Sequence, residues 1–283
     1  MKNLRPAAFA LTLLCIPLLN CGGGSATSAA SKPAPWTLVW SDEFNAANGS
    51  LPDSTKWTYD IGGKGWGNSE LEYYTNRPIN ASIQNGNLVI QELKETYTGS
   101  DGVTRNYTSA RLKSQNLFQQ TQGRFEARIK LPAGQGMWPA FWMLGDNIDR
   151  AGWPACGEID IMENIGSEPS TVHGSAHGPG YTGGTGVGSQ YSLPSGQPLS
   201  ADFHLYAVEW ESNVIRYYLD STLYETITPA SLPAGSPWVF DHPFFLLLNV
   251  AVGGDWPGSP DATTVFPQTM LVDYVRVYKR ASK

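Results

Sequence analysis

The sequence predicts an all-β protein built from two packed antiparallel sheets. Runs suited to strands recur with turn signals between them, and no long stretch shows the 3.6-residue apolar period of a helix. These runs cover residues 82–93 around the turn Asn85-Gly86, 123–131, 203–210, 214–219, 244–252 and 270–278. Such spacing is typical of a β-sandwich. The glycine-rich segment 178–188 lacks periodicity and indicates a long loop, which often borders a binding site.

Size and charge limit what the chain can bind. With 283 residues, of which 41% are hydrophobic, it can bury a substantial core as one domain. Only 16% of residues are charged and the formal net charge is -6, so no basic patch is available to gather phosphates and we expect no nucleic-acid partner. The 10 Trp and 13 Tyr suit sugars, whose C–H faces stack on aromatic rings, although most of these side chains should fill the core.

The first residues are typical of an export signal. Lys2 and Arg5 precede an apolar stretch, 7–19, that is too short to span a bilayer. We therefore expect residues 1–20 to be removed from the mature protein. No later segment is suited to crossing a membrane, so a membrane would be contacted only through the new N-terminus.

The residues around the predicted cleavage point resemble those at which bacterial lipoproteins are cut and lipidated. The segment reads Leu18-Leu19-Asn20-Cys21-Gly22, and Asn20 stands where the lipoprotein pattern usually has a small residue. We expect Cys21 to carry the lipid and to anchor an exported protein at the cell envelope. Ordinary secretion after cleavage within 26–30 is the alternative.

The rest of the chain divides into a linker and one domain. Residues 21–35 are mostly Gly, Ala, Ser, Thr and Pro, a composition that does not pack a core and predicts a flexible linker. The predicted folded domain is 36–283, which we expect to be a monomer. Cys156 is the single cysteine of this domain, so no internal disulfide is expected, and we interpret it as a buried structural thiol.

The most informative segment is 156–164, Cys-Gly-Glu-Ile-Asp-Ile-Met-Glu-Asn, in which acids alternate with isoleucines until the alternation breaks. Alternate side chains of a strand share a face, so Glu158 and Asp160 point together, away from the isoleucines. Unbroken alternation would turn Glu163 inward and bury its charge. A one-residue β-bulge at Ile161-Met162 returns Glu163 to the acidic face, and such bulges are frequent near active sites. The strand therefore predicts three acids in one row.

A solvent-exposed sheet face that carries acids by chance is the alternative. However, no Lys or Arg lies between Glu158 and Glu168 to offset the repulsion, and such crowding is tolerated most readily where it shifts pKa values usefully. Two carboxyls can cleave a glycosidic bond, one as the proton donor and one as the nucleophile. One short strand reaches about the 5–5.5 Å of retaining enzymes, whereas inverting enzymes need roughly 6.5–9.5 Å, so we expect retention. Asp160 could then hydrogen-bond the nucleophile.

The acidic segment, together with Trp138-Pro139-Ala140-Phe141-Trp142-Met143-Leu144-Gly145, resembles glycoside hydrolase family 16. The bulged motif, with Met162 as the inserted residue, is similar to the laminarinase branch rather than the lichenase branch. The likeness covers nearly the whole domain, from Trp40-Ser41-Asp42-Glu43-Phe44 to Val272-Asp273-Tyr274-Val275-Arg276-Val277-Tyr278.

This resemblance implies a β-jelly roll with a concave substrate cleft and endo-hydrolysis of β-1,3-glucan, such as laminarin, without a cofactor for catalysis. It implies Glu158 as the nucleophile, Asp160 as its helper and Glu163 as the acid/base.

Several aromatic residues are candidates for sugar contact. Trp138 and Trp142 share one face of a strand, but parity does not say whether that face is the cleft or the core. The resemblance places tryptophans of this strand against the bound sugar. Trp153 and Trp256 lie in turn-rich segments, where a tryptophan is more often functional than in a strand.

The polar candidates come from three segments. Thr171, His173, Ser175 and His177 share one face of another strand, so an imidazole could reach a sugar hydroxyl or the acid/base. The resemblance favours His177 and also matches Asn68 and Arg111 to polar positions in laminarinase clefts. Without it, these would be ordinary structural or surface residues.

The sequence does not favour a catalytic metal. Zinc sites draw on closely spaced His and Cys, and the four-residue spacing of His173 and His177 falls in a strand, where such residues diverge. The resemblance implies instead a structural Ca²⁺ away from the cleft, with Glu43, Gly86 and Asp273 as oxygen ligands. Three unrelated turn residues are the alternative.

Two other functions remain open. The chain could cleave mixed-linkage β-1,3-1,4-glucan, agarose or carrageenan, although sulfated substrates would call for a basic cleft that the acidic composition does not offer. It could also be a glucan-binding module that does not cleave, but such modules lose the acids that Glu158, Asp160 and Glu163 supply.

Overall fold

The computed structural model of the protein describes residues 34–281. The predicted export signal, Cys21 and all but the last two residues of the predicted linker lie outside the described residues. Within the described part, no helix is long and apolar enough to cross a membrane. The predicted strand runs are confirmed, and the turn at 85–86 joins two of them with both residues at positive φ, as a two-residue hairpin requires.

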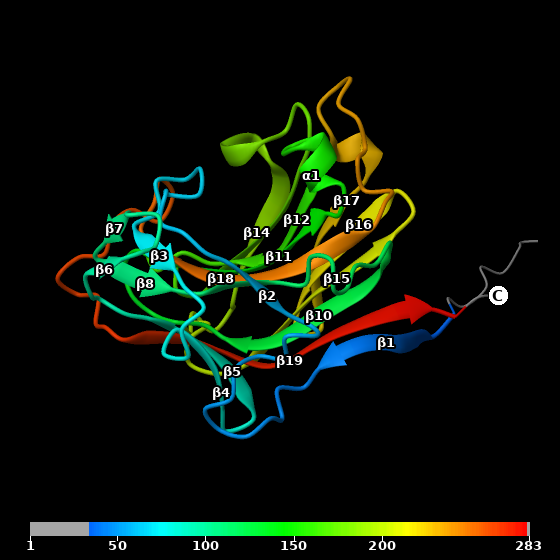
Figure 1. Ribbon diagram of the computed structural model, residues 1–283. Helices are drawn as coiled ribbons and strands as arrows, with labels where there is room; N and C mark the ends of the chain where they lie inside the picture. The colour runs from blue at the N-terminus through cyan, green and yellow to red at the C-terminus, as the bar shows by residue number, and fades with distance from the viewer. Residues whose placement is uncertain (1–33, 282–283) are drawn as a thin grey trace, which may run out of the picture. The chain divides into compact units, whose positions relative to one another are not determined.

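One of the two large sheets is eight-stranded and antiparallel (Figure 1). Its order is β17 (Thr222–Ile227), β16 (Val214–Leu219), β15 (His204–Glu211), β10 (Gly123–Lys130), β19 (Gln268–Arg280), β5 (Asn87–Glu92) and β4 (Ala81–Gln84), with β1 (Trp36–Asp42) also paired to β19.

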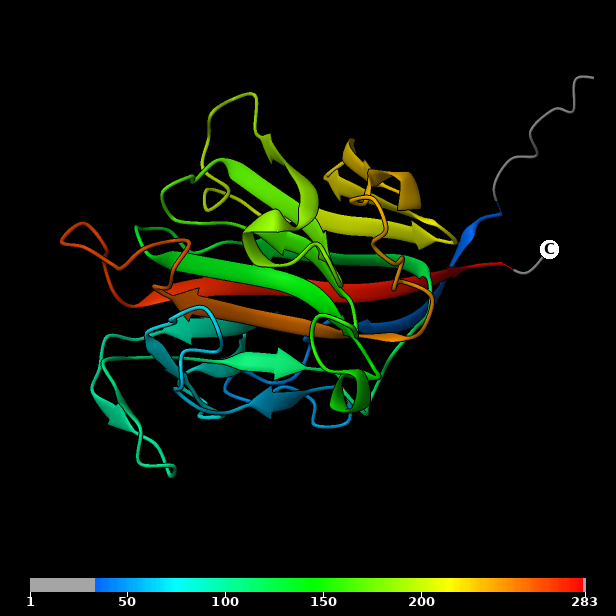
Figure 2. The same ribbon diagram turned by 90° about the horizontal axis from the view of Figure 1, so that it is seen from above.

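The second large sheet has seven antiparallel strands and carries the predicted acidic row. Its order is β14 (Val187–Ser192), β13 (Thr171–His177), β12 (Glu158–Glu163), β11 (Met137–Gly145), β18 (Phe244–Val252), β9 (Arg111–Lys113) and β2 (Thr58–Asp60). Seen from above, the strands of the two sheets run in similar directions, as in an aligned sandwich (Figure 2).

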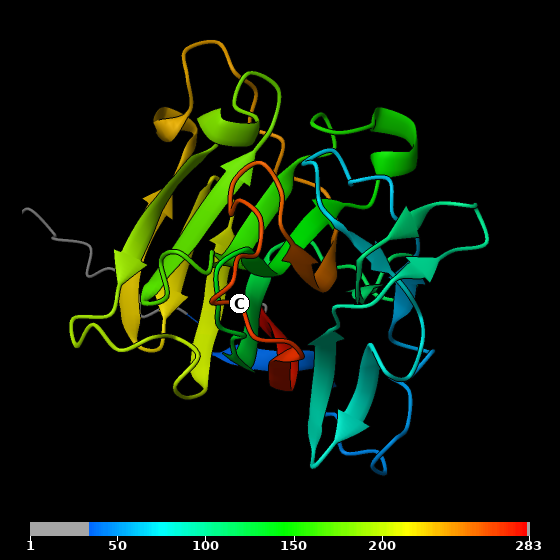
Figure 3. The same cartoon turned by 90° about the vertical axis from the view of Figure 1, so that its left-hand side faces the viewer.

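Short elements complete the described fold. Strand β3 (Glu72–Tyr74) pairs in parallel with β8 (Tyr107–Ser109), and β6 (Tyr97–Thr98) pairs with β7 (Thr104–Arg105). These pairs lie on the side of the domain away from β14 (Figure 3). The helices are α1 (Ile148–Ala151) and two 3₁₀ turns, Gly183–Thr185 and Pro229–Ser231. The expected loop 178–188 contains the first of these turns, and its last two residues begin β14.

The core lies between the two large sheets. From β11, Phe141 and Met143 join it, and from β12, Ile159 and Ile161 do so, all with no exposed surface. Their alternate neighbours on both strands therefore face away from the core. We call that side of the seven-stranded sheet, which carries Glu163, the acidic face.

The predicted bulge is present in β12. Toward β13, Asp160 pairs with Ser175 and Glu163 pairs with His173, so two residues of β12 oppose the single residue Gly174. Both residues of the bulge, Ile161 and Met162, are buried in the core. A Cβ on Gly174 would lie 2.5 Å from the hydroxyl of Tyr224 and 2.6 Å from the ring of Tyr217, so a glycine lets the bulge pack on the other sheet.

Candidate active site

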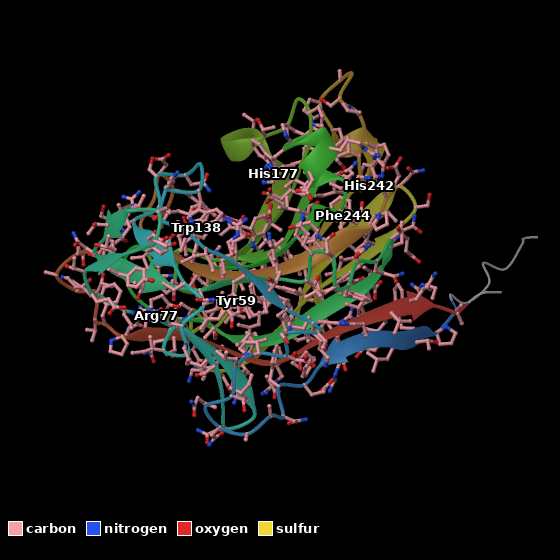
Figure 4. All side chains as sticks on the ribbon, viewed as in Figure 1. Tyr59, Arg77, Trp138, His177, His242 and Phe244 are labelled. Carbon is pink, nitrogen blue, oxygen red and sulfur yellow. The ribbon has the colours of Figure 1, made fainter. Side chains whose placement is uncertain are left out.

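One row of directly paired residues crosses the acidic face. It contains His173 of β13, Glu163 of β12, Ala140 of β11, Asn249 of β18, Arg111 of β9 and Asp60 of β2. Trp138 and Trp142 flank Ala140 by two positions and so share its side, which resolves the parity that the sequence left open. Trp138 and His177 lie on the same side of the sheet in Figure 4.

Each of the three acids of β12 accepts a hydrogen bond from a different donor. The indole N–H of Trp153 donates to Glu158 Oε2 at 2.8 Å, and that of Trp138 donates to Glu163 Oε1 at 2.9 Å. Asp160 Oδ2 accepts from the hydroxyl of Ser175 at 2.7 Å and lies 3.0 Å from His177 Nε2. The same imidazole nitrogen lies 3.9 Å from Glu158 Oε1.

Burial and mutual repulsion shift the titration of these groups. Burial, followed by the charge of Asp160, raises the pKa of Glu158 well above its usual range and the pKa of Glu163 to about 8. Burial alone would lower the pKa of His177, but its hydrogen bond to Asp160 and the surrounding acids raise that pKa to about 9. His177 therefore carries a positive charge at neutral pH.

The position of Asp160 corrects one expectation. We expected it to hydrogen-bond the nucleophile, but its side chain bonds Ser175 and His177. Its influence on Glu158 and Glu163 is through charge, because it raises the pKa of both. Asp160 therefore holds the imidazolium in place and favours protonated neighbours.

Ligand atoms of Glu158, Asp160 and His177 lie within 4.8 Å of one another, a spacing that a metal ion could bridge. The imidazole nitrogen that faces the acids already lies 3.0 Å from Asp160 Oδ2, so it is engaged in an ion pair. The donor set therefore fits an ion-paired cluster better than a metal centre.

The aromatic residues predicted to bind sugar lie next to the acids of β12. Trp256 is 41% exposed and packs edge-on against Trp138 and His173, with ring centroids 5.5 Å and 4.9 Å away. Trp153 is 48% exposed although its N–H is bonded to Glu158. Both loop tryptophans thus combine an accessible ring with a contact inside the site.

Arg111 and Asn68 are both held by neighbours. The guanidinium of Arg111 lies between two indoles, 4.8 Å from the ring of Trp66 and 4.7 Å from that of Trp142, and its Nε lies 3.0 Å from an oxygen of Asp60. The amide of Asn68 donates to a carboxylate oxygen of Glu70 at 3.2 Å.

Two neighbours of the predicted site were not predicted from the sequence. Asn249 accepts the indole N–H of Trp142 at 2.7 Å, and Trp66 stacks on Arg111. A signal for the first exists, since Asn249 is the single polar residue in the nine-residue strand β18, Phe-Phe-Leu-Leu-Leu-Asn-Val-Ala-Val. Trp66 stands in a Gly-Trp-Gly loop, the context that drew attention to Trp153 and Trp256.

Comparison with known proteins decides the family. The family model of "Glycosyl hydrolases family 16" matches residues 67–276. The chain belongs to this family. It is 44% identical to the "Beta-glucanase" of Rhodothermus marinus, over 98% of this chain and 96% of the relative. It is 37% identical to "Glucan endo-1,3-beta-glucosidase A1" of Niallia circulans, over 87% of this chain and 38% of that longer relative.

Solved structures agree with this assignment. The catalytic domain of an endo-1,3-beta-glucanase (laminarinase) from Thermotoga petrophila RKU-1 is 49% identical, with a TM-score of 0.83 over 88% of this chain and 100% of that one. The endo-beta-1,3-glucanase from Pyrococcus furiosus is also 49% identical, with a TM-score of 0.84 over 88% and 97% of the two chains. The protein is a glycoside hydrolase with the jelly-roll fold of family 16.

The residues expected to bind Ca²⁺ lie on or directly beside three neighbouring strands of the eight-stranded sheet. Pairing of β1 and β5 to β19 brings Glu43 and the turn at Gly86 toward Asp273. Both oxygens of Glu43 accept from Arg276, at 3.0 and 2.8 Å, and Asp273 Oδ2 pairs with Arg128 at 2.7 Å. Both carboxylates of the expected Ca²⁺ site are therefore engaged by arginine side chains.

Cys156 is buried and unbridged in the described part of the chain, as the sequence predicted. Burial, with the nearby charge of Glu158, raises the pKa of its thiol to about 11. A thiol in this state is not a nucleophile at neutral pH.

Asp160→Asn should move the alkaline limb of the pH profile of kcat/KM to lower pH. Removing this charge lowers the pKa of Glu163 from about 8 and leaves its proton less tightly held. The same raised pKa means that the native state binds the proton more tightly than the unfolded chain. Its contribution to stability is thus present below the ordinary glutamate pKa of 4.5 and lost as pH rises through the raised pKa of about 8.

Initial rates on a soluble β-glucan, from about pH 5 to about pH 10, measure the limb. Asp220→Asn is the matched control, because it removes an aspartate paired to a different imidazole, that of His204, and should leave the limb in place. A limb that stays, or moves upward, in Asp160→Asn contradicts this account of the site.

Proposed function

We propose that the protein is an exported endo-hydrolase of β-1,3-glucan, such as laminarin, that retains the anomeric configuration. The main support for this proposal is the bulged strand β12, which places Glu158, Asp160 and Glu163 on one face. Trp153 donates a hydrogen bond to Glu158, and Trp138 donates one to Glu163. Support for the linkage comes from the relatives and solved structures named as endo-1,3-glucanases and laminarinases.

In the first step, Glu158 attacks the anomeric carbon as Glu163 transfers its proton to the departing glycosidic oxygen. This division of roles follows the family resemblance, because burial and the charge of Asp160 raise the pKa of both glutamates. The N–H of Trp153 and the imidazole of His177 favour the ionised form of Glu158 but do not offset that rise in its pKa. The pKa of Glu163, raised to about 8, keeps this group protonated at neutral pH, as a general acid requires.

In the second step, Glu163 accepts a proton from water while the water oxygen attacks the anomeric carbon. The bond to Glu158 breaks, Glu158 returns as a carboxylate, and two inversions give net retention. The indole N–H of Trp138 supports the carboxylate form of Glu163 between the two steps, since it lowers the pKa of that group.

Sugar rings would be held by the accessible aromatic faces of the site. We assign stacking to Trp138, Trp142, Trp153 and Trp256, and hydroxyl recognition to Asn68, Arg111 and His177. In this assignment the acidic face offers few free cations, because Arg111 is paired with Asp60 and His177 with Asp160. A neutral glucan therefore fits better than a sulfated polysaccharide, and mixed-linkage glucan is the remaining alternative. Sizing the products from laminarin and from lichenan separates the two linkages.

The assignment of the two glutamates predicts opposite products from two variants. Glu163→Ala should fail on laminarin but form the glycosyl-enzyme from an aryl β-glycoside with a good leaving group, and azide should then give the β-glycosyl azide. Glu158→Ala forms no intermediate, so azide should attack directly and give the α-glycosyl azide. Proton NMR of the anomeric centre distinguishes the products. Exchanged products would reverse the assignment, and inversion by the wild type would exclude the retaining mechanism.

We also propose a structural Ca²⁺ bound by Asp273 and the backbone carbonyls of Glu43 and Gly86. Because a ligand that binds only the native state stabilises it, Ca²⁺ should raise the unfolding midpoint and chelation should lower it. Asp273→Asn should abolish this difference while retaining catalysis. An unfolding midpoint that Ca²⁺ and chelation both leave unchanged would contradict this site.

The export proposal rests on the N-terminal sequence. We propose that lipidated Cys21 is the mature N-terminus and holds the enzyme at the cell envelope. Palmitate labelling of the expressed protein should be lost in Cys21→Ser. Labelling that persists in this variant would exclude Cys21 as the lipidated residue, and a wild type that takes up no label would favour simple secretion.

A further inference from the structure

Two buried carboxyl groups lie close together outside the proposed reaction. Glu70 is 4% exposed, and Glu72, the first residue of β3, has no exposed surface. A buried charge costs several kcal/mol unless it is paired or hydrogen-bonded, so the bonds that these groups make indicate why they are there.

One chain of hydrogen bonds runs from the acidic face to Glu70. The indole N–H of Trp142 donates to Asn249 Oδ1 at 2.7 Å, and the amide nitrogen of Asn249 lies 3.1 Å from the hydroxyl oxygen of Tyr74. That hydroxyl donates to Glu70 Oε2 at 3.0 Å. An indole can only donate, so the direction of every later bond is fixed, and the chain has to end on an acceptor.

A second donor reaches the other oxygen of Glu70. The amide of Asn68 donates to Oε1 at 3.2 Å, and the backbone carbonyl of Asn68 accepts the N–H of Asp255 at 2.8 Å. Asp255 precedes Trp256, so this bond also links the segment to the loop that carries an exposed indole. Both oxygens of Glu70 thus receive hydrogen bonds from groups connected to the site.

Glu72 secures the pair from the inner side. Burial, followed by the charge of Glu70, raises the pKa of Glu72 well above its usual range. Its Oε2 accepts the backbone N–H of Val252 at 2.6 Å. Val252 ends β18, the strand of Asn249, so the pair is tied to the sheet as well as to the loop.

We propose that Glu70 and Glu72 form a positioning pair that holds Asn68 and Trp142 in the orientation that binds the glucan. The inference rests on the proposed function, because that function assigns sugar contact to these two residues. The pair touches none of the reacting atoms. Its loss should weaken substrate binding and leave the chemical step at Glu158 and Glu163 unchanged.

Glu70→Gln is the direct test, because it keeps the shape but presents an amide N–H₂ to one of the two donors. KM for laminarin should rise about tenfold, equivalent to about 1.4 kcal/mol, with kcat within about twofold of the wild type. Tyr74→Phe keeps Glu70 and cuts only the branch to Asn249 and Trp142. It should raise KM by a smaller factor and serves as the second variant should the first unfold.

Glu92→Gln is the matched control. Glu92, on β5, is also fully buried and lies near Glu72, whose charge contributes to its raised pKa. Among the described residues neither of its oxygens has a hydrogen-bond partner, so it stands outside the chain that reaches Trp142. This variant should change the melting temperature and leave KM unchanged.

Two results would contradict the proposed positioning role of Glu70 and Glu72. One is a fall in kcat with constant KM in Glu70→Gln, and the other is an equal rise of KM in Glu92→Gln. Failure of the proposed function looks different, because the wild type itself would then not hydrolyse laminarin. The same comparison of KM and kcat, made on whichever β-glucan is cleaved, would still decide the role of the pair.

Discussion

The site depends on the charge balance of a short row of acids. Glu158, Asp160 and Glu163 face one way on one strand, and like charges at this spacing repel. The protein limits this repulsion by raising carboxyl pKa values and by placing the imidazolium of His177 beside Asp160 and Glu158. The two glutamates that we propose as nucleophile and acid/base thus coexist within one strand.

Much of the fold could be predicted because it follows from local periodicity. The alternation of acids and isoleucines predicted the acidic row, and the break at Met162 predicted the bulge, because burying Glu163 would have been costly. The parallel pair β3 and β8 was not predicted, since it joins segments distant in the sequence and has no periodic signal. Helix α1 has four residues and is too short to show a helical period.

The sequence predicted which residues form the candidate site, but it did not predict most of their contacts. The side faced by Trp138 and Trp142 depends on which face of the sheet meets the other layer, and local sequence does not contain this. Likewise, the bond from Trp153 to Glu158 depends on how the loop after α1 folds back. Asn249 needed no distant information, because a lone amide in a wholly buried apolar strand implies a specific partner.

The bulge in β12 also affects where the turn after this strand begins. An acid four positions after Glu158 would share its face without any bulge, whereas Glu163 is five positions on. The extra residue therefore leaves the catalytic face as it was and lengthens the backbone ahead of the next turn. There Asn164 donates to the carbonyls of Glu168 and Thr171, at 2.9 and 2.8 Å. The bulge thus moves the start of the turn into β13 by one residue while Glu163 stays on the acidic face.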